Sequence, residues 1–262
     1  AQDMTILEII VLDDCSTDRS PEIIAELAAS SPAPIRFVPN ETNSGNVFRQ
    51  WQKGLELARG DYIWIAEADD LAAPDFLSTV MRGFEAPGVV LSYCESAQID
   101  GEGNLLAADY RYYTNDVAPE KWDRNYVGSG HAEIEQALFL KNTILNASAV
   151  VMRADALREV FAQHRDEIEG LRFAGDWAVY LNLLTKGDIA YSALSKNYHR
   201  RHQSSVTLSN FNAQQLDEII AMQNKAAGLI GPDRHRRQRV EAVIAELEKQ
   251  FGLEPRQSRS VG

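Results

Sequence analysis

Cysteine is scarce in this sequence of 262 residues. Its two cysteines, Cys15 and Cys94, supply neither a disulfide framework nor the paired spacing of a metal site. The sequence also lacks a run of about 18 apolar residues and a basic leader followed by an apolar segment, so we expect neither a membrane span nor secretion. A cytoplasmic location is therefore predicted, and the glycosylation sequons at Asn40 and Asn146 are interpreted as chance matches.

Positive charge is scarce as well. Lysine and arginine number 26 against 38 aspartates and glutamates, which gives a net charge of -12. This charge argues against nonspecific binding to nucleic acid or to anionic lipid, because both are polyanions. An anionic substrate would therefore need either a metal ion or a local basic cluster to hold it.

Short apolar runs alternate regularly with helical patterns. The runs that predict strands lie at residues 8–12, 35–38, 62–66, 89–93, 147–152 and 189–192. Apolar residues at helical spacing predict helices at residues 20–28, 45–58, 74–84, 134–140, 154–161 and 177–184. This alternation predicts a three-layer, Rossmann-like α/β fold with a mostly parallel sheet, and residues 62–66, apolar on both faces, should lie in its middle.

Two other segments have a different character. Residues 101–130 lack regular patterning, and we interpret them as a connection over the sheet edge that can serve as a substrate lid. Residues 214–250 are predicted to be helical, with a break at Gly231-Pro232. A late helical pair of this kind often packs on a second subunit or a neighbouring domain, so a homodimer or a longer parent chain is hypothesised.

Two acidic pairs directly follow predicted strands. Asp13-Asp14 ends the first apolar run, and Glu67-Ala68-Asp69-Asp70 follows the third. Ligands of open α/β sheets bind at the carboxyl ends of the strands, so both pairs should face one crevice. Two carboxylates ~4 Å apart repel by roughly 4 kcal/mol at an effective dielectric constant of ~20, and a divalent cation removes that cost. Mg2+ or Mn2+ is therefore predicted at Glu67 and Asp69, whereas Asp70 alone is equally well explained as a helix cap.

Basic and imidazole side chains gather at Lys196, His199, Arg200, Arg201 and His202. A solvated charge run is the usual explanation for such a segment. Here the segment directly follows a predicted strand, which favours a diphosphate clamp, because arginine binds phosphate oxygens bidentately and a neutral imidazole can complete a metal shell. A second basic run, at residues 234–239, is interpreted as a solvated face or a partner contact.

Four motifs in sequence order resemble glycosyltransferase family 2. Residues 8–20, EIIVLDDCSTDRS, resemble that family's nucleotide-binding strand and its Asp-Asp-Gly-Ser-Thr-Asp turn. Residues 41–77, ETNSGNVFRQWQKGLELARGDYIWIAEADDLAAPDFL, are similar to its Asn-x-Gly helix, Gly-Asp-Tyr-Ile strand and Asp-x-Asp segment. Residues 175–207, GDWAVYLNLLTKGDIAYSALSKNYHRRHQSSVT, resemble its acceptor-side helix and closing Tyr-x-Arg-x-His segment. The resemblance implies a GT-A fold and a nucleotide-sugar donor.

The resemblance also implies roles for individual residues. Asp13 and Asp14 would hold the base and ribose of a nucleotide, Asp69 would bind the metal ion, and Glu67 would occupy the first acidic place of the Asp-x-Asp segment. Asp176 falls where the family keeps its catalytic base, and a carboxylate at the amino end of a helix can be held within reach of a sugar hydroxyl. The simpler alternative is that Asp176 only caps the helix and that its tryptophan neighbour belongs to the core.

The remaining candidates follow from the family pattern and the local charge. A histidine near the closing segment can be a metal ligand in the family, and His202 is preferred to His199. The predicted ligands of Mn2+ or Mg2+ are thus Asp69 and His202. The predicted nucleotide- and donor-binding residues are Asp13, Asp14, Asn43, Arg49, Glu67, Ala68, Arg200 and Arg201.

The sequence departs from the family pattern at four places. The family fold normally begins with a strand and a helix upstream of residue 8; that first strand is predicted to be missing here, which should expose an apolar strand edge or face. Cys15 replaces the usual glycine after the aspartate pair, so the turn should not need a positive φ. Glu67 replaces an aspartate, and Gly175 stands where a second acid is often found.

The sequence thus predicts a metal-dependent, inverting glycosyltransferase of the hexosyltransferase type, which acts in polysaccharide or other glycan assembly. Its partners would be a nucleotide-diphosphate sugar and a glycan or lipid-linked acceptor, with peripheral membrane association left open. Residues 1–208 would form the GT-A domain, with a nucleotide-binding part at about 1–100 and an acceptor part at about 101–208, and residues 209–262 a helical extension.

Three alternatives remain open. A glycoside hydrolase also uses two carboxylates, but it needs neither a nucleotide nor a metal. A phospho-acceptor receiver module also clusters acids at strand ends, although it is usually about half this length. A catalytically silent GT-A scaffold within a larger multidomain protein would keep the fold without the chemistry.

Overall fold

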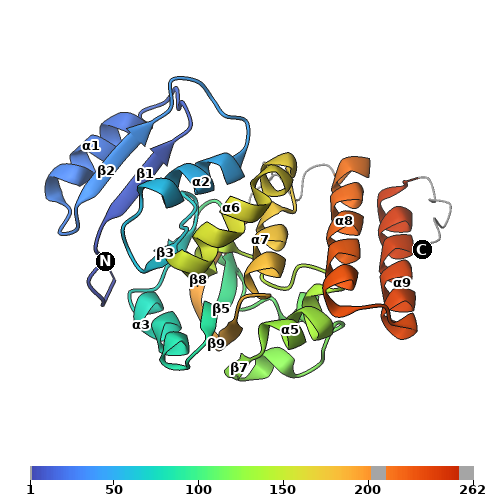
Figure 1. The fold of residues 1–262 in the computed structure, drawn as a ribbon. Helices are drawn as coiled ribbons and strands as arrows, with labels where there is room; N and C mark the ends of the chain where they lie inside the picture. The colour runs from blue at the N-terminus through green and yellow to red at the C-terminus, as the bar shows by residue number, and fades with distance from the viewer. Residues whose placement is uncertain (1, 202–210, 254–262) are drawn as a thin grey trace.

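The computed structural model describes residues 2–201 and 211–253 (Figure 1). The strands of the described chain are β1 (Ile9–Asp13), β2 (Ile35–Pro39), β3 (Tyr62–Trp64), β4 (Leu71–Ala72), β5 (Val89–Ile99), β6 (Leu105–Ala107), β7 (Tyr126–Gly128), β8 (Val150–Arg153) and β9 (Asp188–Arg200). The α-helices are α1 (Ser20–Ser30), α2 (Val47–Leu57), α3 (Phe76–Met81), α4 (Arg111–Thr114), α5 (Gly130–Glu133), α6 (Ala154–Gly170), α7 (Gly175–Leu183), α8 (Ala213–Ile230) and α9 (Arg234–Phe251). Shorter helical turns are η1 (Arg82–Glu85), η2 (Lys121–Asp123), η3 (Ile134–Leu138) and η4 (Ala147–Ala149).

The strands form two sheets. β1 and β2 pair in parallel as a two-stranded sheet, and a seven-stranded sheet has the order β3-β8-β5-β9-β4, with β6 on β5 and β7 on β9. β5 and β9 are parallel, and β3 runs in their direction because both β3 and β5 are antiparallel to β8. The short strands β4, β6 and β7 add antiparallel pairs at the margins. β3, β5 and β9 therefore share one direction, and β8 runs against them between β3 and β5 in a mixed sheet.

Helices cover both faces of the larger sheet, which confirms the three-layer α/β architecture. Side chains of α2, α6, α7 and α8 build a large core cluster on one face, whereas α3 and η1 build a smaller one on the other. The period-2 alternation of β8 divides its residues between them: Val150 and Met152 belong to the large cluster and Val151 to the small one. Each such buried aliphatic side chain contributes ~1.5–3 kcal/mol to folding.

Strand β3 lies at an edge, not in the middle of the sheet as predicted. Both of its faces are covered, since Ile63 packs on the large cluster and Tyr62 and Trp64 on the small one, which explains its two-sided apolar pattern. Within the described residues, however, β3 pairs only with β8, and β1 only with β2. An apolar sequence pattern indicates that the faces of a strand are buried, but it does not show whether the edges of that strand are paired.

Apolar surface is exposed on α1 and just before β1. The apolar stripe predicted for α1 is not buried: Ile23 is 48% exposed and Leu27 56%. Leu7, just before β1, is also exposed. The helix itself is confirmed, with Pro21 in its first turn, but its N-cap position is Arg19, without a side-chain cap.

The irregular segment 101–130 is fixed to the sheet by buried side chains. Tyr110, Val117 and Trp122 are buried in it, and Trp122 Nε1 donates a hydrogen bond to Tyr93 Oη at 2.9 Å. These contacts make the middle of the segment part of the core, whereas Leu105, at its start, is exposed. A lid role for the segment stays a prediction.

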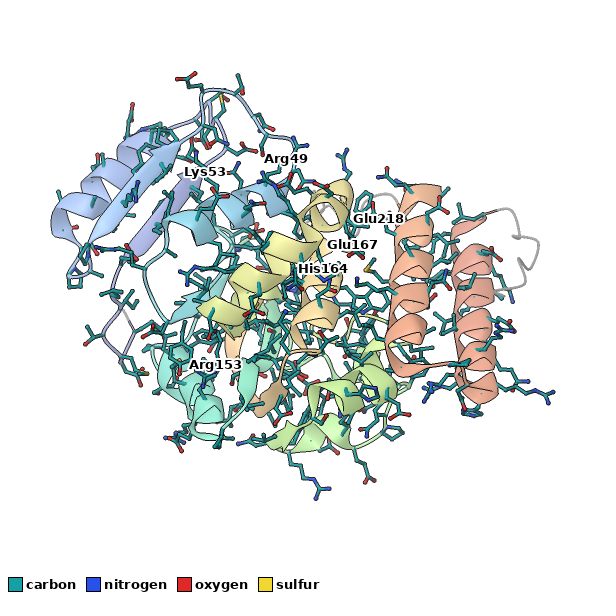
Figure 2. All side chains as sticks on the ribbon, viewed as in Figure 1. Arg49, Lys53, Arg153, His164, Glu167 and Glu218 are labelled. Atoms are coloured by element: carbon teal, nitrogen blue, oxygen red, sulfur yellow. The ribbon has the colours of Figure 1, made fainter. Side chains whose placement is uncertain are left out.

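Helix α8 belongs to the core of the α/β unit. Leu216, Met222 and Ala226 are buried, the last two in the large core cluster, while α9 packs on the outer side of α8 (Figure 1). Glu218 on α8 points toward the start of α7 (Figure 2), where its carboxylate accepts hydrogen bonds from the backbone N–H groups of residues 172–174. None of the helices in the described part of the chain has the length and apolar character needed to cross a bilayer.

Candidate active site

Three carboxylates meet in the loop that follows β3. One carboxylate oxygen from each of Glu67, Asp69 and Asp70 lies within 4.8 Å of the other two. The loop turns tightly, with the Asp70 N–H donating to the Glu67 carbonyl at 3.3 Å, and Ala68 lies exposed at the turn without a polar side chain of its own. Oxygen donors in this arrangement fit Mg2+ or Mn2+, which bind one or two carboxylates and complete their shells with water and phosphate oxygens.

The acidic loop raises the pKa of its own first member. Glu67 is open to solvent on one side but surrounded by protein on the others, and this desolvation, with the charges of Asp70, Asp69 and Asp176, raises its pKa to about 7. Asp176 contributes to this raised pKa, so the predicted base lies within electrostatic range of Glu67, although more than a hundred residues separate them in the sequence. A bound cation would reverse this effect, because it stabilises the ionised carboxylates.

Asp70 is held by the protein on both of its oxygens. Asn146 Nδ2 donates to Asp70 Oδ2 at 2.8 Å, and the backbone N–H of Arg200 donates to Asp70 Oδ1 at 2.9 Å. The alternative role of Asp70 as a helix cap is wrong, because α3 begins at Phe76 with Asp75 in its N-cap position. Asp70 therefore anchors the acidic loop, and one of its oxygens lies within 4.8 Å of a carboxylate oxygen of Glu67 and of Asp69.

Asp176 lies in the first turn of α7, with its carboxylate oriented from two sides. Asn142 Nδ2 donates to Asp176 Oδ2 at 2.9 Å, and the backbone N–H of Trp177 donates to Asp176 Oδ1 at 2.7 Å. Burial raises the pKa of Asp176 to about 6, against the lowering effect of these two hydrogen bonds. Trp177 is a core residue, as the simpler alternative supposed, but Asp176 also has the raised pKa that suits a general base.

The glycine before Asp176 has a steric cause. A Cβ at Gly175 would lie 2.4 Å from the ring of Phe48, which packs against the start of α7. A second acid cannot stand at this position unless Phe48 moves. Gly175 thus leaves room for Phe48 of α2. Asp176 is the single carboxylate of this turn.

The basic residues at the end of β9 are mostly engaged within the protein. Arg200 Nε donates to the Asp69 carbonyl at 2.7 Å, and Arg200 Nη1 donates to the carbonyls of Asp100 and Gly101. Arg200 therefore braces the acidic loop against the turn after β5, which leaves little of its guanidinium for a diphosphate. Lys196 is paired with Asp75 at 2.6 Å.

His199 and Arg201 lie on the other side of the same loop. His199 Nδ1 and Tyr110 Oη are hydrogen-bonded at 2.6 Å, and burial lowers the pKa of His199 although the charge of Asp70 opposes it. Arg201 interacts with the Tyr110 hydroxyl, and its charge counteracts the raised pKa of that tyrosine. His202, the preferred metal-ligating histidine, lies outside the described residues.

Asp14 and Asn43, two of the predicted nucleotide-binding residues, belong to one hydrogen-bonded cluster. Partial burial tends to raise the pKa of Asp14, but hydrogen bonds from Ser44 and Asn40 outweigh it and leave the pKa lowered. Asn43 Nδ2 donates to the Asp14 carbonyl at 2.9 Å, and Arg49 pairs with Glu169 at 3.5 Å (Figure 2). These side chains thus build the loop itself, beside a hollow of about 390 Å³ lined by Asp14, Asn43, Gly45, Asn46, Val47, Gln50 and Arg172.

The turn after β1 differs from the prediction. Asp13 is buried and its Oδ2 accepts a hydrogen bond from Ser16 N at 3.1 Å, which closes the turn. Cys15 has a φ of 68°, so the turn does require a positive φ in spite of the cysteine. Cys15 thus adopts a backbone conformation that glycine adopts more easily.

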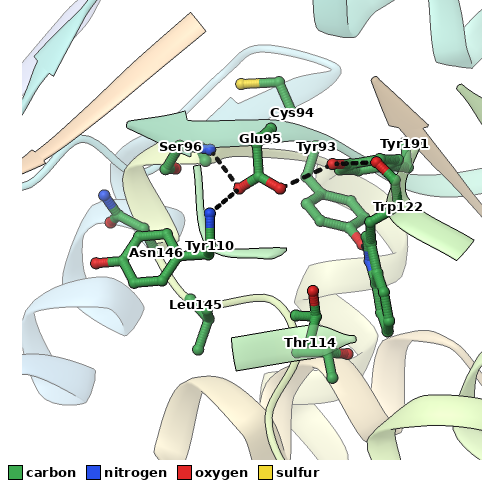
Figure 3. A pocket seen from close by; sticks show the side chains of 12 residues that line it. Tyr93, Cys94, Glu95, Ser96, Tyr110, Thr114, Trp122, Leu145, Asn146 and Tyr191 are labelled. Carbon is green, nitrogen blue, oxygen red and sulfur yellow. Dashed lines mark hydrogen bonds between the residues drawn. The ribbon is translucent and has the colours of Figure 1, made fainter. Parts of the chain in front are cut away.

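A buried polar cluster that the sequence did not reveal lies behind the site (Figure 3). Glu95 on β5 accepts hydrogen bonds from Ser96 N, Tyr110 N and Tyr191 Oη, and burial raises its pKa. The cavity next to it holds about 20 Å³, room for about one water molecule. Asn146 lines this cavity and also contacts Asp70, so the cluster supports the acidic loop from behind.

Asn142, Asn146 and Ser148 are the functional residues that the sequence motifs missed. The one available signal was the sequon at Asn146, which the structure explains by burial and hydrogen bonding.

The second basic run, at residues 234–239, makes contacts within the chain: Arg236 pairs with Glu135, and Arg239 donates to the Val117 carbonyl.

The fold is that of GT-A glycosyltransferases. The crystal structure of S. aureus TarS 1-349 in complex with UDP-GlcNAc superposes with a TM-score of 0.64 and 16% sequence identity, covering 95% of this chain and 66% of that one. Residues 1–161 match the family model described as glycosyl transferase family 2. This chain therefore belongs to glycosyl transferase family 2.

Several curated proteins are similar to this chain. The uncharacterized protein Rv1520 of Mycobacterium tuberculosis is 27% identical over 202 residues, which cover 76% of this chain and 51% of that protein. The putative glycosyltransferase EpsH of Bacillus subtilis is 30% identical over 46% of this chain and 34% of its own length. Chondroitin synthase of Escherichia coli is 31% identical over 42% of this chain and 16% of its own length. The chain thus aligns with about half or less of the length of these relatives.

Proposed function

We propose that this chain is the catalytic unit of a metal-dependent, inverting hexosyltransferase, which moves a sugar from a nucleoside-diphosphate donor to a hydroxyl of a glycan or lipid-linked acceptor. The observation that carries the proposal is that Asp176, whose pKa is raised to about 6, and the cluster of Glu67, Asp69 and Asp70 are contacted by one short segment, through Asn142 and Asn146. Membership of glycosyl transferase family 2 supports the reaction class. Similarity to TarS, whose crystal structure contains UDP-GlcNAc, and to chondroitin synthase supports a nucleotide-sugar donor and a role in glycan assembly.

The acidic loop suits a divalent cation. Glu67 and Asp69 offer carboxylate oxygens, and Asp70 keeps them in place through its contacts with Asn146 and Arg200. When bound, Mn2+ or Mg2+ would neutralise negative charge on the diphosphate of the donor. Arg201 would add a second positive charge at the same end of β9.

Asp176 would act as the base of the transfer. One of its carboxylate oxygens takes the proton of the acceptor hydroxyl while the acceptor oxygen forms a bond to the anomeric carbon. The bond from that carbon to the diphosphate oxygen breaks on the opposite face, and the nucleoside diphosphate leaves. A single displacement of this kind inverts the anomeric configuration.

Several predictions from the sequence stay predictions. They include donor contacts by Asp13, Asn43, Arg49 and Ala68, a metal contact by His202, the division at residue 208, the homodimer, peripheral membrane association and the cytoplasmic location. Asp14 and Arg200 are better supported as residues that shape their loops, because their polar atoms are engaged within the protein.

The proposal is tested by incubating the chain with nucleotide sugars and Mn2+ and following release of nucleoside diphosphate by mass spectrometry. Asp176→Asn should abolish transfer while Mn2+ binding is retained, and Asp69→Ala should lose both. Asp61→Asn is the matched control, since Asp61 is exposed at the start of β3 and should change neither. A wild-type chain that binds Mn2+ and nucleotide but neither hydrolyses nor transfers any sugar would favour the silent scaffold.

A further inference from the structure

Residues 142–148 lie between η3 and β8. They contact Asp176, the proposed catalytic base. Asn142, the first of these residues, donates from Nδ2 to Asp176 Oδ2 at 2.9 Å. The Oδ1 atom of the same amide accepts a hydrogen bond from Ile144 N at 3.1 Å, so the side chain is fixed from within the segment. Asn142 therefore sets the orientation of the Asp176 carboxylate.

The other end of the segment reaches the acidic loop. Asn146 Nδ2 donates to Asp70 Oδ2 at 2.8 Å and to Asn197 Oδ1 at 2.8 Å, while Ser148 Oγ accepts a hydrogen bond from the backbone N–H of Glu67 at 2.9 Å. Asn146 is 5% exposed, Ser148 1% and Asn197 0%. Asn197 Oδ1 also accepts a hydrogen bond from Ser96 Oγ at 3.0 Å, so these buried groups form a connected network and the arrangement is stiff.

The chemistry of the two asparagines is specific. An amide can donate to a carboxylate with one end and accept a backbone hydrogen bond with the other, as Asn146 does by accepting from Ser148 N at 3.0 Å. An aspartate at either position would place a like charge against Asp70 or Asp176. The sequon at residues 146–148 is thus a buried turn, and Asn146 has no open face for a glycan.

We propose that residues 142–148 hold the base and the metal-binding loop in register, with Asn142 as the positioning residue of Asp176, and with Asn146 and Ser148 as the positioning residues of the loop that carries Glu67 and Asp69. This inference rests on the function proposed above. The segment is short and buried at both contacts, so the separation of base and cation is set by one piece of chain, independently of the substrate. Loss of a contact at one end should affect only the function of that end.

The metal end is tested first, with Mn2+ alone and no sugar. Free Mn2+ is titrated by electron paramagnetic resonance in wild type, Asn146→Ala and Ser148→Ala, with Asn182→Ala as control; Asn182 is equally buried, but its Nδ2 donates only to Ala178 O inside α7. Residues that orient metal ligands typically contribute 10–100-fold in affinity, so Asn146→Ala should weaken Mn2+ binding by about 10-fold or more, and the control by less than about 2-fold. If Asn146→Ala fails to fold, the smaller change Ser148→Ala decides, with an expected loss of about 3-fold or more.

The base end is tested with Asn142→Ala. The hydrogen bond from Asn142 favours the ionised Asp176, so its loss should move the acid limb of the pH profile of kcat/KM to higher pH and lower kcat. The other titratable groups that influence this region are Glu67, Tyr113 and Tyr180, whereas the Asn142 side chain is hydrogen-bonded to Asp176 and to Ile144 N. Mn2+ affinity of Asn142→Ala should stay within about 2-fold of wild type, because the loop contacts are intact.

The outcomes separate the two proposals. A wild-type chain that binds no Mn2+ overturns both the proposed function and this inference. A wild type that binds Mn2+ and turns over nucleotide sugar, with Asn146→Ala and Ser148→Ala equal to the Asn182→Ala control, overturns the inference alone. An Asn142→Ala variant with an unmoved acid limb and unchanged kcat also overturns it.

Discussion

Replacing Glu218 by alanine is expected to lower the free energy of unfolding by about 2–4 kcal/mol. The Glu218 carboxylate accepts hydrogen bonds from Arg172 N at 3.0 Å, Phe173 N at 2.7 Å and Ala174 N at 3.0 Å. A hydrogen bond to a charged acceptor contributes ~1.5–3 kcal/mol, but water can reach Arg172 and, in part, Phe173 after truncation, whereas Ala174 is buried. The expected loss in free energy of unfolding is therefore roughly that of one or two such hydrogen bonds, and not of three.

The assay is equilibrium unfolding in urea at pH 7, followed by circular dichroism. Glu241→Ala is the control, since Glu241 is an exposed glutamate on α9, and its substitution should stay within ~0.5 kcal/mol of wild type. Glu218→Gln keeps one acceptor oxygen and should fall between the two. The reasoning is refuted if Glu218→Ala unfolds at the same urea concentration as Glu241→Ala.

Three further changes have defined expectations. Burial raises the pKa of Asp176 from 3.8 to about 6. Between about pH 4 and 6 the folded chain therefore keeps a proton that the unfolded chain has released. Above about pH 6 the ionised Asp176 carboxylate lowers the stability of the folded chain. Asp176→Asn should accordingly raise the free energy of unfolding at pH 7.5 by on the order of 1 kcal/mol, a gain that disappears below about pH 4; a gain that persists there would contradict the assigned pKa. Cys15→Gly should be neutral or stabilising by up to ~1 kcal/mol in thermal unfolding, because glycine adopts the positive φ freely, and a clear loss would mean that the thiol contact with Glu41 matters more. Gly175→Ala should destabilise by ~1–3 kcal/mol through the clash with Phe48, and a second change, Phe48→Leu, should recover part of it; without recovery the clash is not the cause.

Apolar patterns in the sequence predicted helices and strands well where one face of the helix or strand is buried. The apolar run before Asp13 predicted β1 to within one residue, and the spacing of Phe48, Trp51 and Leu55 predicted the buried face of α2. The same signals were wrong about β3, because an apolar pattern does not reveal whether both edges of a strand are paired. They also failed at Cys15, where the path of the turn decides φ and the residue type only sets its cost.

The candidate site was predictable in part. The motif around Asp69 and the position of Asp176 at a helix start are local features, and in the structure the charge of Asp176 reaches Glu67 of that motif. The contacts of Asn142 and Asn146 could not be predicted, because each joins residues 34 or 76 positions apart through the packing of several elements. For the same reason the charge run near Arg200 suggested a free clamp, whereas its guanidinium is used to brace the acidic loop.

Calorimetric titration of the chain with a nucleoside diphosphate, with and without Mn2+, tests the central claim most directly. The account predicts binding that needs Mn2+, is lost in Asp69→Ala and is retained in Asp61→Asn. Binding of equal strength without the metal, or binding that survives in Asp69→Ala, would contradict it.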